Sequence, residues 1–121
     1  MQHCSKLLKQ SSTVPGVSYL VRRMTFGRRL EMMRSVKELA RRLEFHAAGS
    51  TVEDQAEGGI LAFEISKLYL TWGLAKIYDL EIDGSPATPD SLIENGPEPL
   101  CQEILTVIKA ECFLSEEERK N

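Results

Sequence analysis

The segment from Val52 to Tyr78 carries apolar residues on two opposite sides of a helical wheel, and no other pattern constrains the fold as strongly. One apolar side consists of Leu61, Ile65, Leu68 and Trp72. The other side consists of Ala56, Phe63, Leu70, Leu74 and Ile77. A helix that is apolar on two sides has to be covered on both, so the sequence predicts a central helix that is sandwiched between other elements.

The glycines of this segment are costly within a helix, because each one destabilises it by roughly 0.8 to 1 kcal/mol relative to alanine. Gly58-Gly59 lies in the first third of the segment and Gly73 lies towards its end. We expect Gly58-Gly59 to let a neighbouring helix approach closely. A break of the helix after Trp72 remains an alternative.

A second helix is predicted from about Phe26 to Ala48, with Thr25 as its N-cap and Gly49 as a left-handed terminator. Its core-facing stripe consists of Met32, Val36, Leu39, Ala40, Leu43 and Ala47. Arg34, Lys37 and Arg41 lie nearly opposite this stripe. They can form either a solvated helix face or a surface that binds a partner.

The remaining chain is predicted to hold one short strand and two further helices. Val17 to Met24 alternates in the manner of a strand, and residues 80–83 are the evident partner within the chain. Thr88-Pro89-Asp90 is typical of a helix start, followed by a stop at Asn95-Gly96 and a new helix from Pro97. Ser115 begins a capping-box pattern close to the end of the sequence. We therefore expect a mainly α-helical fold, a small domain of three to four helices with or without a short two-stranded β element.

The organisation follows from these elements. Residues 1–16 are predicted to form a flexible N-terminal arm, residues 17–114 a single helical domain, and residues 115–121 a charged C-terminal tail. The 121 residues suffice for one hydrophobic core. No apolar run approaches the roughly 20 residues of a membrane span, and the start of the chain lacks the apolar core of a signal peptide. We expect a cytoplasmic protein that does not contact a membrane.

The net charge of −3 conceals an asymmetry along the chain. Residues 1–50 carry ten Lys or Arg against three acidic residues, and residues 51–121 carry five against fifteen. Such a chain can bind an anionic partner, or it can pack basic surface on acidic surface within or between copies. A nucleic-acid complex is the weaker interpretation, because the pI is about 5.4 and no helix-turn-helix spacing or aromatic-basic pattern is present.

The sequence holds no recognisable catalytic or metal-binding motif. His3 and His46 form no pair, and His46 lies at the border of the apolar stripe, which favours a packing role. The three cysteines Cys4, Cys101 and Cys112 have neither zinc-ligand spacing nor an even number, so free thiols are expected, with the last two as buried hydrophobic residues. The acidic residues Asp79, Glu81 and Asp83 lack the pattern of a calcium loop. We predict no enzyme activity and no cofactor.

Three parts of the sequence together resemble tail assembly chaperones of long-tailed bacteriophages and prophages. They are VSYLVRRMTFGRRLEMM from Val17, LTWGLAKIYDLEIDGSPATPDSLIENGPEPLCQEI from Leu70, and LSEEERKN at the end, so the resemblance covers about residues 17–121. It implies a non-enzymatic protein of the host cytoplasm that binds the tape measure protein, aids assembly of the tail tube and leaves the finished tail. It also implies that a longer form is made by ribosomal frameshifting, which would fit the unfinished helix signal at Ser115.

A chaperone of this kind needs an exposed apolar surface on which a helix can dock. We predict that its partner-binding residues are Met32, Met33, Arg34, Lys37 and Arg41. Leu68 and Trp72 are interpreted as core residues. Two other functions remain open: a structural virion protein, such as a head or tail completion subunit that forms rings as a homo-oligomer, and a small nucleic-acid-binding regulator.

Overall fold

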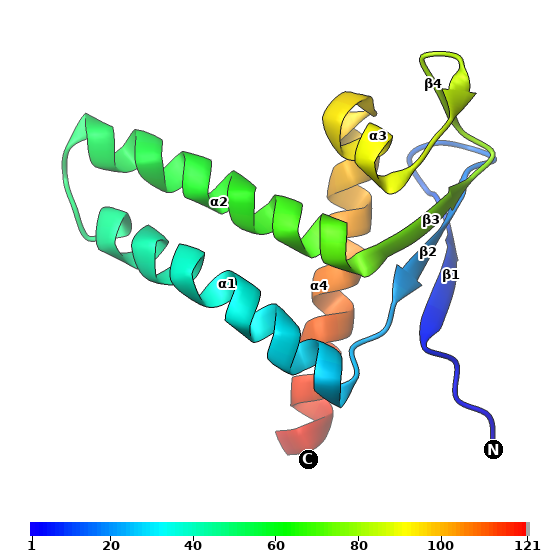
Figure 1. Cartoon of the computed structure of the whole chain (residues 1–121), viewed down its shortest axis with the longest axis horizontal. Helices are drawn as coiled ribbons and strands as arrows, with labels where there is room; N and C mark the ends of the chain where they lie inside the picture. Colours follow the sequence, from blue (N-terminus) through cyan, green and yellow to red (C-terminus); the bar gives the residue numbers. More distant parts are fainter. Residues whose placement is uncertain (121) are drawn as a thin grey trace. The chain divides into compact units, whose positions relative to one another are not determined.

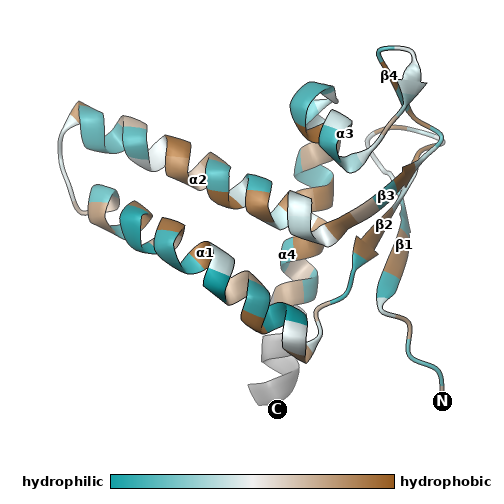
Figure 2. Cartoon of the chain, viewed as in Figure 1, coloured by the Kyte–Doolittle hydropathy of each residue, from teal (hydrophilic) through white to brown (hydrophobic). Residues whose placement is uncertain are grey.

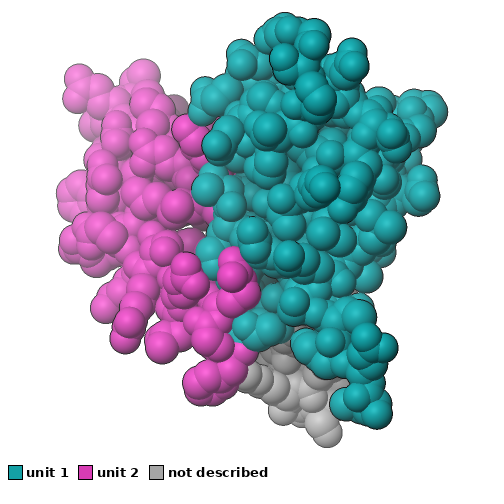
Figure 3. Space-filling view, turned by 45° about the vertical axis from the view of Figure 1, so that its right-hand side comes forward, with its two compact units in different colours: residues 1–25, 69–121 teal, residues 26–68 magenta. Residues whose placement is uncertain are grey.

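The computed structural model describes the backbone of residues 1–120 and the side chains of residues 1–112 (Figure 1). The elements follow in the order β1 (Lys6–Gln10), β2 (Ser18–Arg22), α1 (Phe26–Ala47), α2 (Val52–Gly73), β3 (Leu74–Tyr78), β4 (Glu81–Ile82), β5 (Ser85–Pro86), α3 (Pro89–Asn95) and α4 (Glu98–Lys120). They divide into two compact units, which Figure 3 colours separately. Unit 1 comprises residues 1–25 and 69–121, and unit 2 comprises residues 26–68.

Unit 1 is built on an antiparallel sheet with the strand order β1-β2-β3. The alternation that predicted β2 is confirmed, because Tyr19 and Val21 are buried while their neighbours are half-buried. β2 pairs with β1 on one side, with Leu8 opposite Leu20, and with β3 on the other, with Tyr19 opposite Ile77. The predicted pairing of this strand with residues 80–83 is wrong.

The core of unit 1 lies between this sheet and the helices α3 and α4, of which α3 packs against β3 and α4 against β2. Its buried residues are Val17, Tyr19, Val21, Leu70, Leu74, Ile77, Ala87, Leu92, Leu100, Ile104, Leu105 and Ile108. The helix predicted from Pro97 is confirmed as α4, and its apolar residues Leu100, Ile104 and Ile108 are buried. At Gly73, the last residue of α2, the backbone lies close to Ile108 of α4. A Cβ atom on Gly73 would lie 2.8 Å from two carbon atoms of Ile108.

The strands β4 and β5 form a short hairpin around Asp83-Gly84. Both turn residues have positive φ angles, 52° for Asp83 and 81° for Gly84. This is the geometry of the tight hairpin turn that Asp-Gly sequences favour. This hairpin was not predicted from the sequence.

The start of α3 follows the prediction closely. The Thr88 side chain accepts a hydrogen bond from the backbone N–H of Ser91, the Ser91 side chain accepts one from the N–H of Thr88, and Pro89 occupies the first helical turn. Gly96 ends the helix where a Cβ atom would collide with Leu92. Further along, α4 continues through Ser115 to Lys120, so Ser115 starts no new helix. The side chains of its capping box and Asn121 lie outside the described residues.

Unit 2 is a helical hairpin of α1 and the part of α2 up to Leu68. Thr51 caps α2, since its hydroxyl accepts a hydrogen bond from the N–H of Asp54 at 3.0 Å. The Asp54 carboxylate also lies 3.1 Å from Nδ1 of His46 at the end of α1. This contact connects the two helices near the turn between them. Gly49 does not adopt the predicted left-handed conformation; it is needed because a Cβ atom there would collide with the Asp54 carboxylate.

The predicted fold class is therefore wrong: the described chain is a mixed α/β protein with a three-stranded and a two-stranded sheet. The central helix was predicted to reach Tyr78, but it ends at Gly73, near the alternative break after Trp72. Residues 74–78 instead form β3. A bulge opposite Leu20 and Val21 lets both Leu74 and Ile77 face the core, so their spacing of three residues imitates a helix.

Candidate partner-binding surface

The side of α1 that faces away from its predicted core-facing stripe is apolar in its first half and basic in its second. Its apolar part consists of Phe26, Leu30 and Met33, which are exposed and recur at intervals of four and three residues. Its basic part consists of the exposed residues Arg34, Lys37 and Arg41. At 100° per residue these six positions share one side of the helix, which we call the α1 outer face.

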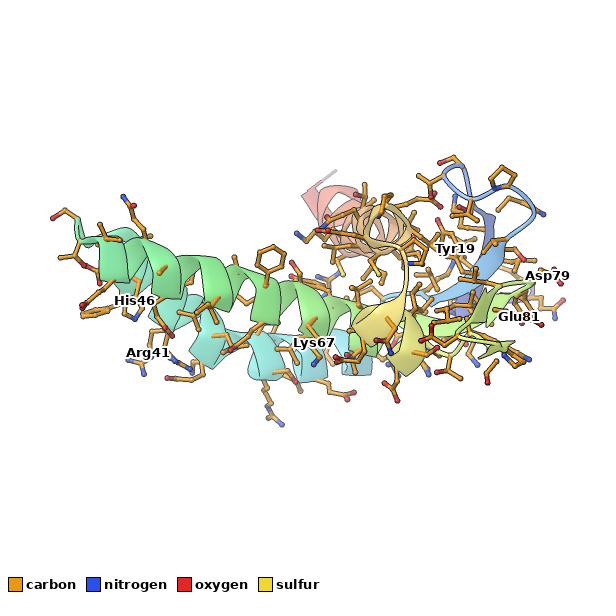
Figure 4. All side chains as sticks on the ribbon, turned by 90° about the horizontal axis from the view of Figure 1, so that it is seen from above. Tyr19, Arg41, His46, Lys67, Asp79 and Glu81 are labelled. Atoms are coloured by element: carbon orange, nitrogen blue, oxygen red, sulfur yellow. The ribbon has the colours of Figure 1, made fainter. Side chains whose placement is uncertain are left out.

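The basic part of the α1 outer face is partly neutralised by α1 itself. Arg41 forms a two-pronged ion pair with Glu38, with Nη2 at 2.7 Å from Oε1 and Nε at 3.2 Å from Oε2. The hydrogen bond from Arg41 lowers the pKa of the Glu38 carboxyl. Figure 4 labels Arg41 on the hairpin, where its side chain is well exposed. The positive charge of this face therefore rests mainly on Arg34 and Lys37.

The structure brings four of the five predicted partner-binding residues together. Met33, which is 63% exposed, lies on the α1 outer face with Arg34, Lys37 and Arg41. Met32 is only 5% exposed and lies on the other side of the helix, because neighbouring positions are 100° apart. Phe26 and Leu30 extend the surface and were not predicted. Their spacing from Met33 was the signal that could have identified them.

A second exposed apolar surface lies on α2 and was not predicted as a surface. It consists of Val52, Ala56, Gly59, Ile60 and Phe63, and we call it the α2 stripe. Val52 is 81% exposed and Phe63 is 67% exposed. Figure 2 shows hydrophobic residues recurring along the whole of α2. The wheel pattern had indicated that Ala56 and Phe63 would be covered, but both are open to solvent.

The adjacent glycines Gly58 and Gly59 of α2 have different surroundings. A Cβ atom on Gly58 would lie 3.8 Å from Leu43 of α1. A Cβ atom on Gly59 would meet nothing within 4 Å. The expected close packing of a neighbouring helix is therefore confirmed for Gly58 and wrong for Gly59 within the described chain.

The most elaborate polar cluster belongs to unit 1 and centres on the carboxylate of Glu103 in α4. Oε1 accepts hydrogen bonds from the hydroxyls of Ser11, Ser12 and Thr13 at 3.1, 3.2 and 2.9 Å. The backbone N–H groups of Ser12 and Thr13 also donate to Oε1, at 3.1 and 3.0 Å. Oε2 accepts from the hydroxyl of buried Tyr19 at 2.7 Å. The loop between β1 and β2 is thereby tied to α4.

The protonation of this cluster indicates a structural role. Burial raises the pKa of Glu103, but the hydrogen bonds from Tyr19, Thr13 and Ser11 outweigh it and lower the pKa to about 2. Burial, followed by the hydrogen bond to Glu103, raises the pKa of Tyr19. A carboxylate with so low a pKa is a poor proton acceptor, and a phenol with a raised pKa is a poor donor near neutral pH. The cluster holds the loop in place.

The histidine, cysteine and acidic residues are spread over the fold. No group of three or more metal-ligating side chains occurs among the residues that the structure describes. Cys112 is buried, and Cys101 is half-buried with its thiol 3.5 Å from the carbonyl oxygen of Leu92; burial raises its pKa. Asp79 and Glu81, labelled in Figure 4, are exposed; Asp79 directly follows β3 and Glu81 begins the β4–β5 hairpin.

No protein-family model matches this sequence, and neither a curated protein nor a solved structure is significantly similar to it. Within the described residues, none of the helices combines the length and the apolar character that crossing a bilayer requires. The comparisons therefore assign no function to this chain.

Proposed function

We propose that this protein is a non-enzymatic morphogenesis factor of bacteriophage tails, which binds the tape measure protein and aids assembly of the tail tube. It would act in the cytoplasm of the host cell. The proposal follows from the sequence resemblance, and one structural observation supports it: the α1 outer face presents exposed apolar side chains next to exposed basic ones.

The α1 outer face is suited to an amphipathic helix with acidic residues beside its apolar side. Phe26, Leu30 and Met33 offer apolar contacts over two helical turns, and methionine adapts its shape to different partners. Arg34 and Lys37 stand beside them and would attract acidic residues of the partner. A chaperone that shields helical segments of a long partner needs this combination.

The second candidate is a structural virion protein that remains in the particle. The charges of the two helices of unit 2 favour it: α1 carries six basic against three acidic residues, and α2 carries one against four. Basic and acidic surfaces of neighbouring copies could then stack into a ring. Mass spectrometry of purified virions separates the two candidates, since a chaperone is absent and a ring subunit is present in stoichiometric amounts.

The direct test is co-expression with the tape measure protein whose gene we expect immediately downstream. The chaperone proposal predicts that the tape measure protein stays soluble with the wild-type chain and precipitates with the Leu30→Glu/Met33→Glu variant. Leu8→Glu is the matched control, because Leu8 is an exposed apolar residue of β1 in unit 1 and lies outside the α1 outer face. If the tape measure protein is as soluble with the Leu30→Glu/Met33→Glu variant as with the control variant, the α1 outer face is not its binding surface.

A further inference from the structure

The α2 stripe has the spacing by which helices pair in coiled coils. Its residues Val52, Ala56, Gly59 and Phe63 follow one another at intervals of four, three and four residues. All four are exposed. This alternation places side chains along a single seam, as at the a and d positions of a heptad repeat. The seam runs along the side of α2 opposite the residues Leu61, Ile65 and Leu68, which are buried or half-buried.

One flank of this seam carries opposite charges at its two ends. Glu53, Ile60 and Lys67 occupy the same flanking position in three successive heptads, and all three are exposed. The acidic residue lies at the start of α2, the basic residue near the end of unit 2, and the apolar residue midway between them. The opposite flank holds Gln55 and Ala62, which carry no charge.

This arrangement of charges complements itself when a second copy of α2 lies antiparallel across the seam. A two-fold axis near Ile60 places Glu53 of each copy beside Lys67 of the other, and the two Ile60 side chains beside each other. A lysine ammonium has three N–H donors, so Lys67 can make this contact together with contacts inside its own chain. A parallel pair would set Glu53 and Lys67 beside uncharged residues instead.

Gly59 gives an independent reason to expect a close neighbour. Glycine within a helix destabilises it relative to alanine, and none of the described residues requires glycine here, since a Cβ atom would meet none of their atoms within 4 Å. In an antiparallel pair with its axis near Ile60, Gly59 and Phe63 lie nearest the centre of the seam, Ala56 lies slightly further out, and Val52 lies towards the ends. Because Gly59 has no side chain, the Phe63 ring of the other copy can pack closely against its backbone.

We infer that the α2 stripe is the interface of an antiparallel homodimer of this protein. The inference is independent of the proposed function and leaves the α1 outer face of each copy free for another partner. Residues 52–67 span about 24 Å of helix, which offers less area than the roughly 800 Å² per partner of a standard stable complex. We therefore expect a reversible dimer with a dissociation constant on the order of micromolar.

Sedimentation equilibrium over a range of protein concentrations tests the interface through its charges. Glu53→Lys places two lysines beside each other at both ends of the interface, so we expect dimerisation roughly tenfold weaker than that of the wild type. Lys67→Glu should weaken it similarly. The double variant Glu53→Lys/Lys67→Glu exchanges the partners and should restore the wild-type dissociation constant to within about threefold.

The matched control is Glu44→Lys, which makes the same change of charge at an exposed position of α1 and should leave dimerisation unchanged. Circular dichroism confirms that each variant is folded. A wild-type chain that is monomeric at every concentration would overturn the inference and leave the α2 stripe for a different partner. A dimer that the double variant fails to restore, or that Glu44→Lys weakens as much as Glu53→Lys does, would place the interface elsewhere.

Discussion

Among the side chains that the structure describes, the hydrophobic core belongs to unit 1, whereas most of the large exposed hydrophobic side chains belong to unit 2. The twelve residues of the core cluster all lie within residues 1–25 and 69–121. In unit 2 only Met32 and Leu61 are buried hydrophobic residues. Its exposed hydrophobic residues are Phe26, Leu30, Met33, Phe45, Val52, Ile60 and Phe63.

The polar contacts, like the hydrophobic ones, are more extensive in unit 1 than in unit 2. In unit 1 the Glu103 carboxylate is held by donors from three loop residues and from buried Tyr19. In unit 2 the pairs Arg41–Glu38 and Arg42–Glu57 are solvent-exposed, and exposed pairs contribute little to stability. The comparison teaches that the buried hydrophobic residues and the most extensive hydrogen-bond cluster belong to unit 1, while unit 2 presents exposed apolar side chains on both of its helices, a kind of surface that often marks an interaction site.

The same substitution in the two units should have very different consequences. Ile104→Ala removes a side chain that is 0% exposed and leaves a cavity, so we expect the free energy of unfolding to fall by about 2 to 5 kcal/mol. Ile60→Ala acts on a side chain that is 53% exposed and should change it by less than about 0.5 kcal/mol. Urea denaturation of the two variants at low protein concentration measures both. Similar losses would abolish the contrast between the units.

The Glu103 cluster should make the stability of unit 1 dependent on charge and pH. Glu103→Gln removes the charge that accepts these hydrogen bonds, and we expect a loss of roughly 2 to 3 kcal/mol. The pKa of Glu103 lies at about 2 in the folded chain, below its ordinary value of 4.5, so the unfolded chain binds the proton more readily. Its contribution to stability is complete above about pH 4.5 and is lost as the pH falls towards 2.

Urea denaturation between about pH 6 and pH 2.5 tests this pH dependence, because the range covers roughly the interval between the two pKa values. The difference in free energy of unfolding between the wild type and Glu103→Gln should shrink as the pH falls. A difference that stays constant over this range would show that the charge of Glu103 does not contribute.

Substituting two glycines of α2 by alanine should change the free energy of unfolding by smaller amounts and in opposite directions. Gly73→Ala forces a Cβ atom to within 2.8 Å of Ile108, and we expect a loss of about 1 to 2 kcal/mol. Gly59→Ala meets open space within a helix and should stabilise the isolated chain by up to about 1 kcal/mol. Thermal denaturation of dilute protein distinguishes them. A destabilising Gly59→Ala would indicate that Gly59 has a role inside the chain.

The elements with clear local signals could be predicted from the sequence. Thr88-Pro89 marked the start of α3, and the alternation around Tyr19 marked β2. β1 was missed because it is an edge strand whose side chains are mostly exposed, so it carries no alternating apolar pattern. β3 was mistaken for helix because the bulge gives Leu74 and Ile77 a helical spacing. These errors concern long-range pairing, which local patterns do not record.

Of the two candidate surfaces, one could be predicted in part from the sequence and the other could not. Arg34, Lys37 and Arg41 could be predicted as one exposed side of α1, because they lie nearly opposite its core-facing stripe on the helical wheel. The α2 stripe could not be recognised, because an apolar helix face has the same pattern whether its own chain covers it or not. The exposure of Phe63 became known only from the structure.

The central claim is that unit 2 contributes interaction surfaces rather than core, and sedimentation equilibrium of the Ile60→Glu variant beside the wild type tests it most directly. Ile60 lies at the predicted two-fold axis, where two glutamates would repel each other. We predict a wild-type dimer, and a variant that is monomeric at the same concentrations with an unchanged free energy of unfolding. A wild-type monomer, or a variant that unfolds as a core variant would, would contradict the account.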